Sequence, residues 1–248
     1  MLDRKHSAPL YEQLKNEIQK MIKDGDLKPD DQIPSERELV EQYNVSRITV
    51  RQAINLAEKE GLVKRVHGVG TFVAKPKIKQ ELSNFNNFES TLQQQGLIAT
   101  TKMLGSQVIT SDFQLSRLLD INVMERVIKL ELIGYGDEIP VVYYNSYFPN
   151  RVGEKMKQAA EKALQAEKPF STLDLYRLDQ EIGLHPTHVE QTFEAQSAHY
   201  PLTEILNVQE GFPLFRVTSI VYQDKTPLEY KETYYRGDKY KFFITRHM

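Results

Sequence analysis

The sequence contains neither cysteine nor tryptophan, and its apolar stretches are short. The absence of cysteine excludes disulfide bonds and zinc sites built on thiolates. No apolar run reaches the roughly 18 residues of a membrane-spanning helix, so we expect no membrane span. The first residues carry charge without an apolar segment behind them, which argues against a signal peptide and favours a cytoplasmic location.

Positive charge is concentrated in one segment, although the whole chain has a formal net charge of −2. Residues 43–80 hold eight Lys and Arg against two Glu, a local excess of six positive charges. Such a basic segment in a nearly neutral chain is what contact with phosphates requires. Charge by itself nevertheless favours an ordinary solvated surface, so the motifs within the segment have to decide.

Three short helices are predicted before residue 61. The first is amphipathic because apolar residues recur at a spacing of about four from Leu10 to Ile22. The second starts at Ser35, where Ser-Glu-Arg-Glu forms a capping box. The third starts after Ser46 and ends at Gly61, with an apolar side that faces inward.

The second and third of these helices, separated by a short turn, suggest a helix-turn-helix. Near the start of the third helix the outward residues are Arg47, Thr49 and Arg51, with Gln52 beside them. An arginine at such a position can donate two hydrogen bonds to guanine in the major groove, and a threonine suits a phosphate or a thymine methyl. The pattern therefore predicts a recognition helix.

A hairpin is predicted next, because alternating segments at 62–66 and 71–73 flank Gly68 and Gly70. The two glycines would let the backbone approach DNA closely, although turn geometry alone also explains them. The hairpin would then be the wing of a winged helix-turn-helix.

The motifs at 34–39, 45–51, 60–62 and 68–73 together resemble the DNA-binding domain of the GntR family, continuously from about residue 10 to residue 73. The resemblance places the wing tip at His67 and Gly68, and we expect phosphate contacts from Arg37, Lys64 and Arg65. The full set of expected DNA-binding residues is Ser35, Arg37, Ser46, Arg47, Thr49, Arg51, Gln52, Lys64, Arg65, His67, Gly68 and Gly70.

The second half of the chain mixes strand-like and helix-like segments, which predicts an α+β domain with a sizeable sheet. Residues 75–86 are charged and interrupted by proline, so we expect a linker between domains at 1–74 and 87–248. The strand-like segments are 102–109, 127–135, 141–148, 189–195, 214–223 and 228–235, and the helix-like segments are 88–95, 114–119, 153–167, 172–180 and 202–206.

This half is similar to the UTRA sensor domain of the HutC subfamily of GntR regulators, which has a chorismate-lyase-like fold. The matching segments include residues 137–140, 147–149 and 206–213, and the most specific match is residues 234–240. The resemblance implies an effector pocket in each subunit and dimerisation through the sheets. The expected effector-binding residues are Phe88, Glu89, Tyr135, Tyr144, Ser171, Thr172, Glu229 and Tyr235.

The expected pocket departs from that of family members that sense phosphosugars. By resemblance, those members tend to carry a Ser or Thr just after the phenylalanine of the first sensor helix, where this chain has Glu89. They also carry two arginines one residue apart in a later strand, where this chain has Leu132 and Gly134. A frequent family glutamate is replaced by Tyr144. A phosphate favours helix amides, hydroxyls and guanidinium groups, so we expect a neutral or cationic effector unless the alignment is displaced by one or two residues.

Enzymatic activity is not expected, because no nucleophile elbow, phosphate loop or paired acid and base motif occurs. His185 and His188 could suggest a metal pair, but no third ligand stands near them in the sequence. We therefore expect no catalytic residues, no metal and no cofactor. The predicted partners are a palindromic double-stranded DNA operator, a small-molecule effector and a second copy of the chain. The open alternatives are a regulator whose sensor domain has lost ligand binding and an enzyme of chorismate-lyase-like fold.

Overall fold

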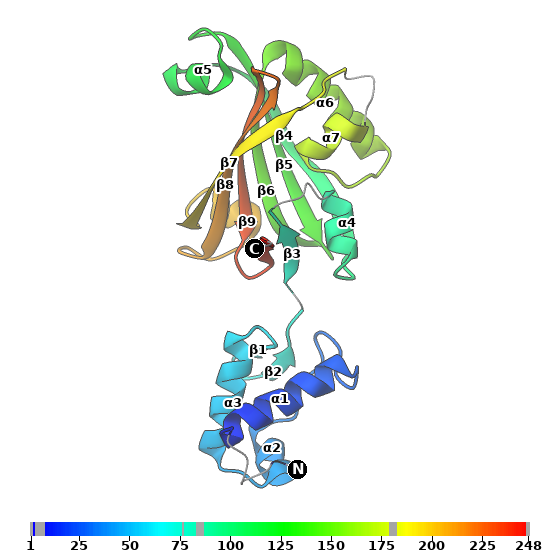
Figure 1. Cartoon of the computed structure of the whole chain (residues 1–248), viewed down its shortest axis with the longest axis vertical. Coiled ribbons are helices and arrows are strands. Elements are labelled where there is room, and N and C mark those ends of the chain that lie inside the picture. The colour runs from blue at the N-terminus through cyan, green and yellow to red at the C-terminus, as the bar shows by residue number, and fades with distance from the viewer. Residues whose placement is uncertain (1, 3–7, 76, 83–86, 179–182, 247–248) are drawn as a thin grey trace. The chain divides into compact units, whose positions relative to one another are not determined.

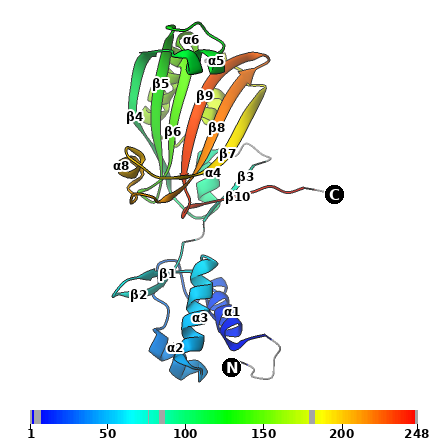
Figure 2. The ribbon, with the colours of Figure 1, turned by 90° about the vertical axis from the view of Figure 1, so that its left-hand side faces the viewer.

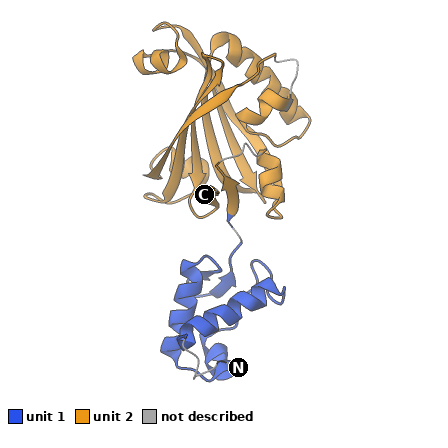
Figure 3. Cartoon of the chain, viewed as in Figure 1, with its two compact units in different colours: residues 1–77 blue, residues 78–248 orange. Residues whose placement is uncertain are grey.

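The computed structural model describes residues 2, 8–75, 77–82, 87–178 and 183–246. The chain divides into two compact units, residues 1–77 and residues 78–248 (Figure 3). Each unit has its own apolar core. None of the described helices is long and apolar enough to cross a membrane.

The first unit is a winged helix-turn-helix. Its elements are α1 (Leu10–Lys23), α2 (Glu36–Tyr43), α3 (Arg47–Lys59), β1 (Val63–Val66) and β2 (Gly70–Val73), and β1 and β2 pair antiparallel (Figure 1). The largest core side chains are those of Leu14, Ile18, Leu39 and Ile54. These residues come from all three helices, so the helical spacing seen in the sequence is what buries the core.

Side-chain caps confirm the predicted starts of the second and third helices at Ser35 and Ser46. The Ser35 hydroxyl accepts a hydrogen bond from the Glu38 amide, and the Glu38 carboxylate accepts one from the Ser35 amide, which completes the capping box. The Ser46 hydroxyl accepts a hydrogen bond from the Thr49 amide at the start of α3. Between the helices, Asn44 takes a left-handed conformation with φ of 51°. Local chemistry thus sets the turn of the helix-turn-helix.

The second unit is built on a six-stranded antiparallel sheet, as the α+β prediction required. Its strand order is β4-β5-β6-β9-β8-β7. The strands are β4 (Ala99–Thr110), β5 (Arg126–Gly136), β6 (Ile139–Pro149), β7 (His188–Ser197), β8 (Pro213–Gln223) and β9 (Thr226–Arg236). The helices are α4 (Phe88–Gln93), α5 (Phe113–Leu119), α6 (Asn150–Gln165), α7 (Thr172–Leu178) and α8 (Leu202–Leu206).

Different helices pack on the two faces of this sheet. On the face we call inner, α6 and α7 pack through Met156, Ala160 and Leu175 against residues of β5 and β6. On the outer face, α8 packs against Tyr143 and Tyr234 and α5 packs against Tyr230. Figure 2 shows the outer face with α5 and α8 at its ends and α6 behind the sheet.

The linker prediction is wrong for residues 78–81. They form β3 (Ile78–Glu81), which pairs parallel with β10 (Tyr240–Phe243) inside the second unit. The cause is Ile78, whose side chain is buried in the core of that unit. Of the rest of the predicted linker, residues 76 and 83–86 lie outside the described residues, as do residues 179 and 180 of the predicted helix 172–180.

Candidate DNA-binding surface and effector pocket

The exposed side of α3 presents the residues predicted to contact DNA. Arg47, Arg51 and Gln52 are exposed at the start of the helix, and Thr49 is half-buried. The Nε of Arg51 donates to the Glu36 carboxylate at 2.9 Å, a contact that a DNA base would have to replace. The Ser46 hydroxyl already has partners within the unit, because it caps the helix and lies 2.9 Å from the Thr49 hydroxyl.

Several of the expected phosphate-binding cations already have acidic partners in the same unit. Arg37 pairs with Glu41 at 2.9 Å. Lys64 pairs with Asp30, and its hydrogen bond holds the pKa of that carboxyl below its usual range. Arg65 pairs with Glu58 at 3.2 Å. All these cations remain at least one-third exposed, so solvent screens the pairs and a phosphate can compete for them.

Gly68 and Gly70, the two glycines of the wing, are each required by a different structural feature. Gly68 takes a left-handed φ of 74° in the turn between β1 and β2, with open space where a side chain would be. A Cβ at Gly70 would collide with the Gln32 side chain, whose amide donates to the Val69 carbonyl. His67 lies beside this turn and is exposed. Gly70 is therefore explained by packing within the unit, whereas Gly68 and His67 remain at a solvent-facing tip.

One exposed residue of α3 escaped the sequence reasoning. Ile48 follows Arg47 in the first turn, and 71% of its surface is exposed. Single exposed apolar side chains are normal on protein surfaces, so it is the position of Ile48 beside Arg47 on the recognition helix that makes it a candidate for contact with DNA. The available signal was its place between Arg47 and Thr49, outside the apolar stripe that forms the core.

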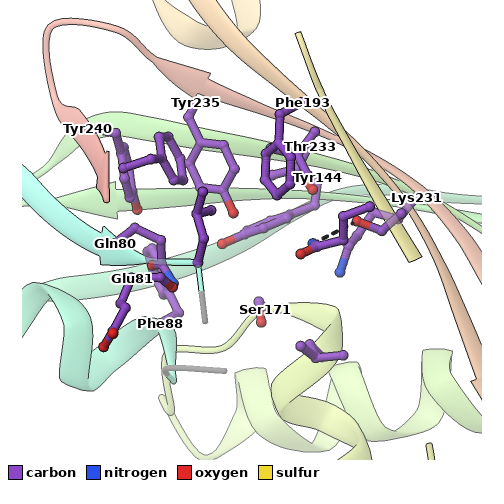
Figure 4. Close-up of a pocket in the computed structure, with 16 residues that line it drawn as sticks. Gln80, Glu81, Phe88, Tyr144, Ser171, Phe193, Lys231, Thr233, Tyr235 and Tyr240 are labelled. Carbon is purple, nitrogen blue, oxygen red and sulfur yellow. Dashed lines mark hydrogen bonds between the residues drawn. The ribbon is translucent and has the colours of Figure 1, made fainter. Parts of the chain in front are cut away.

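A pocket lies on the inner face of the sheet in the second unit (Figure 4). Two rows of cross-strand neighbours line it: Tyr144, Thr233, Val217 and Phe193 form one row, and Lys231, Ser219 and Gln191 form the other. The remaining wall comes from β3, β10, α4 and the residues around the start of α7. The cavity volume is about 90 Å³.

Four of the eight predicted effector residues line this pocket: Phe88, Tyr144, Ser171 and Tyr235. They come from segments nearly 150 residues apart. The Asp174 carboxylate joins two of these segments, because it accepts hydrogen bonds from the Phe88 amide at 3.2 Å and from the Ser171 hydroxyl at 2.9 Å. Burial raises the pKa of the Tyr144 and Tyr235 phenols, so both keep their protons and can donate hydrogen bonds.

Thr172 and Glu229 lie directly behind the pocket wall, fully buried. The Glu229 Oε1 atom accepts hydrogen bonds from the Thr172 hydroxyl at 2.7 Å and the Ser146 hydroxyl at 2.8 Å. The Lys231 ammonium lies 3.8 Å from the same carboxylate oxygen and donates to the Thr172 hydroxyl at 3.1 Å. Lys231 lines the pocket, and the sequence reasoning missed it because a lysine in a strand ordinarily faces solvent.

Glu89 and Tyr135 do not line the pocket. The Glu89 carboxylate accepts a hydrogen bond from the Gln93 side chain at 3.0 Å, along the surface of α4. Tyr135 follows Gly134, and strand alternation puts its ring on the outer face, under the Lys102 ammonium at 5.0 Å. Both residues therefore have local partners away from the cavity.

The two β5 positions singled out in the sequence contribute no charge to the pocket. Leu132 is fully buried in the core. A Cβ at Gly134 would lie 2.6 Å from the Phe88 ring, which means that the aromatic ring occupies the space of a side chain. His188, of the suspected metal pair, stacks on Tyr222 at 4.7 Å, and no cluster of three metal-ligating residues occurs in the described part of the chain.

Fold and surfaces together define a DNA-binding transcription regulator with an attached sensor domain. A model of the bacterial regulatory proteins of the gntR family matches residues 10–73, and a model of the UTRA domain matches residues 94–241. The chain therefore belongs to the GntR family, in its UTRA-containing HutC subfamily, and it is a regulator and not an enzyme.

Two of the following three similar proteins cover nearly the whole chain. The transcriptional repressor NagR of Bacillus subtilis is 28% identical over 242 residues, which cover 97% of this chain and 96% of NagR. The histidine utilization repressor of Klebsiella aerogenes is 33% identical over 138 residues, 56% of this chain and 57% of that protein. The crystal structure of PhnF from Mycobacterium smegmatis has a TM-score of 0.64 at 27% identity and covers 94% of this chain and 99% of PhnF.

Proposed function

We propose that this regulator represses transcription as a homodimer on a palindromic operator in the cytoplasm, and that a small molecule in the inner-face pocket releases it. The supporting observation is the coexistence of an exposed cationic recognition helix in one unit and a pocket on the inner face of the sheet in the other. The relatives with printed functions are repressors, which favours repression over activation.

On DNA, α3 of each subunit enters the major groove, and Arg47 and Arg51 donate to base edges. Lys64 and Arg65 exchange their acidic partners for phosphates, which supplies a salt-dependent part of the binding. His67 and Gly68 at the wing tip reach the neighbouring minor groove. Ile48 adds an apolar contact in the major groove, where the thymine methyl is the matching group.

The outer face of the sheet is the proposed dimer interface. It carries two stacked tyrosine pairs, Tyr143 with Tyr234 and Tyr147 with Tyr230. Buried polar atoms on the same face, the Asn145 Oδ1 and the Arg216 Nε, have no hydrogen-bond partner among the described residues. Aromatic rings and arginine are enriched at protein interfaces, and a second copy of the face would offer partners to both atoms.

The pocket is coupled to the DNA-binding unit through the chain itself. Gln80 and Glu81 of β3 line the pocket together with Leu82, which follows the strand, and β3 begins directly after the residues that leave the winged unit. An effector that binds one arrangement of β3 more tightly than another shifts the spacing of the two recognition helices. Such unequal binding is the physical requirement for release.

The test starts from operators selected out of random duplex DNA with the full-length protein. A palindromic consensus bound with two subunits, and weakened by Arg47→Ala, supports the proposal. Analytical ultracentrifugation measures the subunit number with and without DNA. A monomer on a single half-site would contradict the homodimer, and an unchanged affinity of Arg47→Ala for the operator would contradict the recognition helix.

A further inference from the structure

Half of the side chains that line the pocket are polar and uncharged. Of the sixteen lining residues, Lys231 is the single cation and Glu81 the single anion. Eight neutral side chains carry hydroxyl or amide groups: Gln80, Tyr144, Ser171, Gln191, Ser219, Thr233, Tyr235 and Tyr240. The other lining side chains are apolar, three of them phenylalanine rings. Such a lining suits a ligand with many hydroxyl groups and exposed C–H faces.

Lys231 has hydrogen-bonding capacity left for a ligand. Its side chain is 8% exposed, and its ammonium group can donate three hydrogen bonds. One donor goes to the Thr172 hydroxyl, and the described residues supply no acceptor for the other two. Figure 4 shows Lys231 at the end of the pocket opposite Tyr240. A ligand oxygen at this end would complete the coordination of a buried cation, which is costly to leave unmatched.

The charge of Lys231 is nevertheless already balanced. Glu229 is fully buried at 3.8 Å from the ammonium, and its Oε1 atom is held by two hydroxyl groups. A phosphate would therefore add two negative charges to the pocket without a further cation to receive them. An amine at the Lys231 end of the pocket would face the ammonium itself, and Glu81, the lining anion at the other end, already has an interaction partner. An uncharged acceptor is the group that neither leaves a charge unmatched nor repels Lys231.

The aromatic residues define the shape of the ligand. Tyr235 contacts Tyr240 and Phe242 edge-on at ring distances of 4.6 and 4.9 Å, and Phe88 meets Tyr144 edge-on at 6.4 Å. These rings present apolar walls, while Ser219, Thr233 and Gln191 supply hydrogen bonds from the floor of the sheet. A sugar ring combines the two requirements, because its C–H faces are apolar and its edge carries hydroxyl groups.

We propose that the effector is an uncharged polyhydroxylated compound, a sugar without a phosphate group, and that Lys231 donates a hydrogen bond to one of its oxygens. This inference rests on the proposed function, since it specifies the ligand of the same pocket. It also narrows the sequence-based expectation of a neutral or cationic effector to the neutral class.

The test separates a metabolite extract by charge. Extract from bacteria that carry the gene is passed over anion and cation exchangers, and each fraction is added to the full-length protein on its selected operator. Release by the uncharged flow-through, lost after treatment with phenylboronate resin that retains cis-diols, supports the proposal. Release by a fraction eluted from either exchanger overturns it while leaving the proposed function intact. No release by any fraction contradicts effector control itself.

Variants then test the role of Lys231. With the neutral fraction, or with the pure sugar found in it, Lys231→Met is expected to need roughly tenfold more ligand for release. The variant Lys157→Met is the matched control, because Lys157 is a partly exposed residue of α6 that does not line the pocket. Since Lys231→Met leaves Glu229 without its cation, the double variant with Glu229→Gln restores the charge balance if the single variant unfolds. Unchanged release by both folded variants would show that Lys231 does not contact the effector.

Discussion

The contact proposed for Ile48 leads to a prediction for one methyl group of the DNA. Ile48→Ala removes an exposed apolar side chain, 71% of whose surface is accessible, so the winged unit should unfold at an unchanged temperature. Packing of the isoleucine on a thymine methyl removes roughly 40 Å² of apolar surface from water, worth about 1 kcal/mol. Two subunits double this to about 2 kcal/mol, or about a thirtyfold change in operator affinity.

The assay is fluorescence anisotropy with operators in which single thymines are replaced by deoxyuridine, which lacks only the methyl group. The wild-type protein should lose affinity at one symmetric pair of thymines, and Ile48→Ala should bind both operators equally. This double-mutant cycle isolates the contact between the side chain and the methyl group. Ile98→Ala is the control, because Ile98 is equally exposed at 72% but lies in the second unit.

Two outcomes would refute the reasoning. If Ile48→Ala keeps the same sensitivity to deoxyuridine as the wild type, another residue contacts the methyl group. If no thymine position responds in the wild type although the operator is bound specifically, Ile48 has no apolar partner on the DNA.

Three further predictions concern DNA affinity, core packing and pH. Arg51→Ala should cost about 1–3 kcal/mol at the operator and relax specificity at one base pair, measured by binding to operators substituted at each position. Gly134→Ala should destabilise the second unit by about 1–3 kcal/mol in urea unfolding, because its Cβ would lie 2.6 Å from the Phe88 ring. Burial raises the pKa of Tyr230 and Tyr234 to about 12, so the folded state holds these protons more tightly than an unfolded chain, whose tyrosines have the ordinary pKa of 10.0. The stability from these phenols is present below pH 10 and is lost as pH rises toward 12, which unfolding monitored together with tyrosinate absorbance would detect.

The winged unit was predictable from the sequence because its signals are local. Ser35 and Glu38 cap a helix three residues apart, and the apolar stripe of α1 repeats within each turn. The strands of the second unit were also recognisable, since strand alternation needs only neighbouring residues. The UTRA resemblance supplied four residues that the pocket brings together.

The structure differs from the other expectations where the packing and orientation of whole elements decide, because neighbouring residues do not record these. Ile78 seemed part of a charged linker, but its strand pairs with residues 240–243 at the other end of the unit. Glu89 was placed in the pocket, yet the rotation of α4 turns it toward Gln93. Tyr135 was expected there as well, and the alternation of β5 puts it on the opposite face.

The sequence by itself thus determined the class of protein, because capping, helical periodicity and turn chemistry act within a few residues of the chain. Only the tertiary structure decided what the pocket contains. The buried Lys231 ammonium donates to the Thr172 hydroxyl, which in turn donates to Glu229. At Gly134, the Phe88 ring occupies the space that a side chain would need. The physical reason is that charge balance and packing depend on which side chains the fold brings within a few ångströms, and no short stretch of sequence records those neighbours.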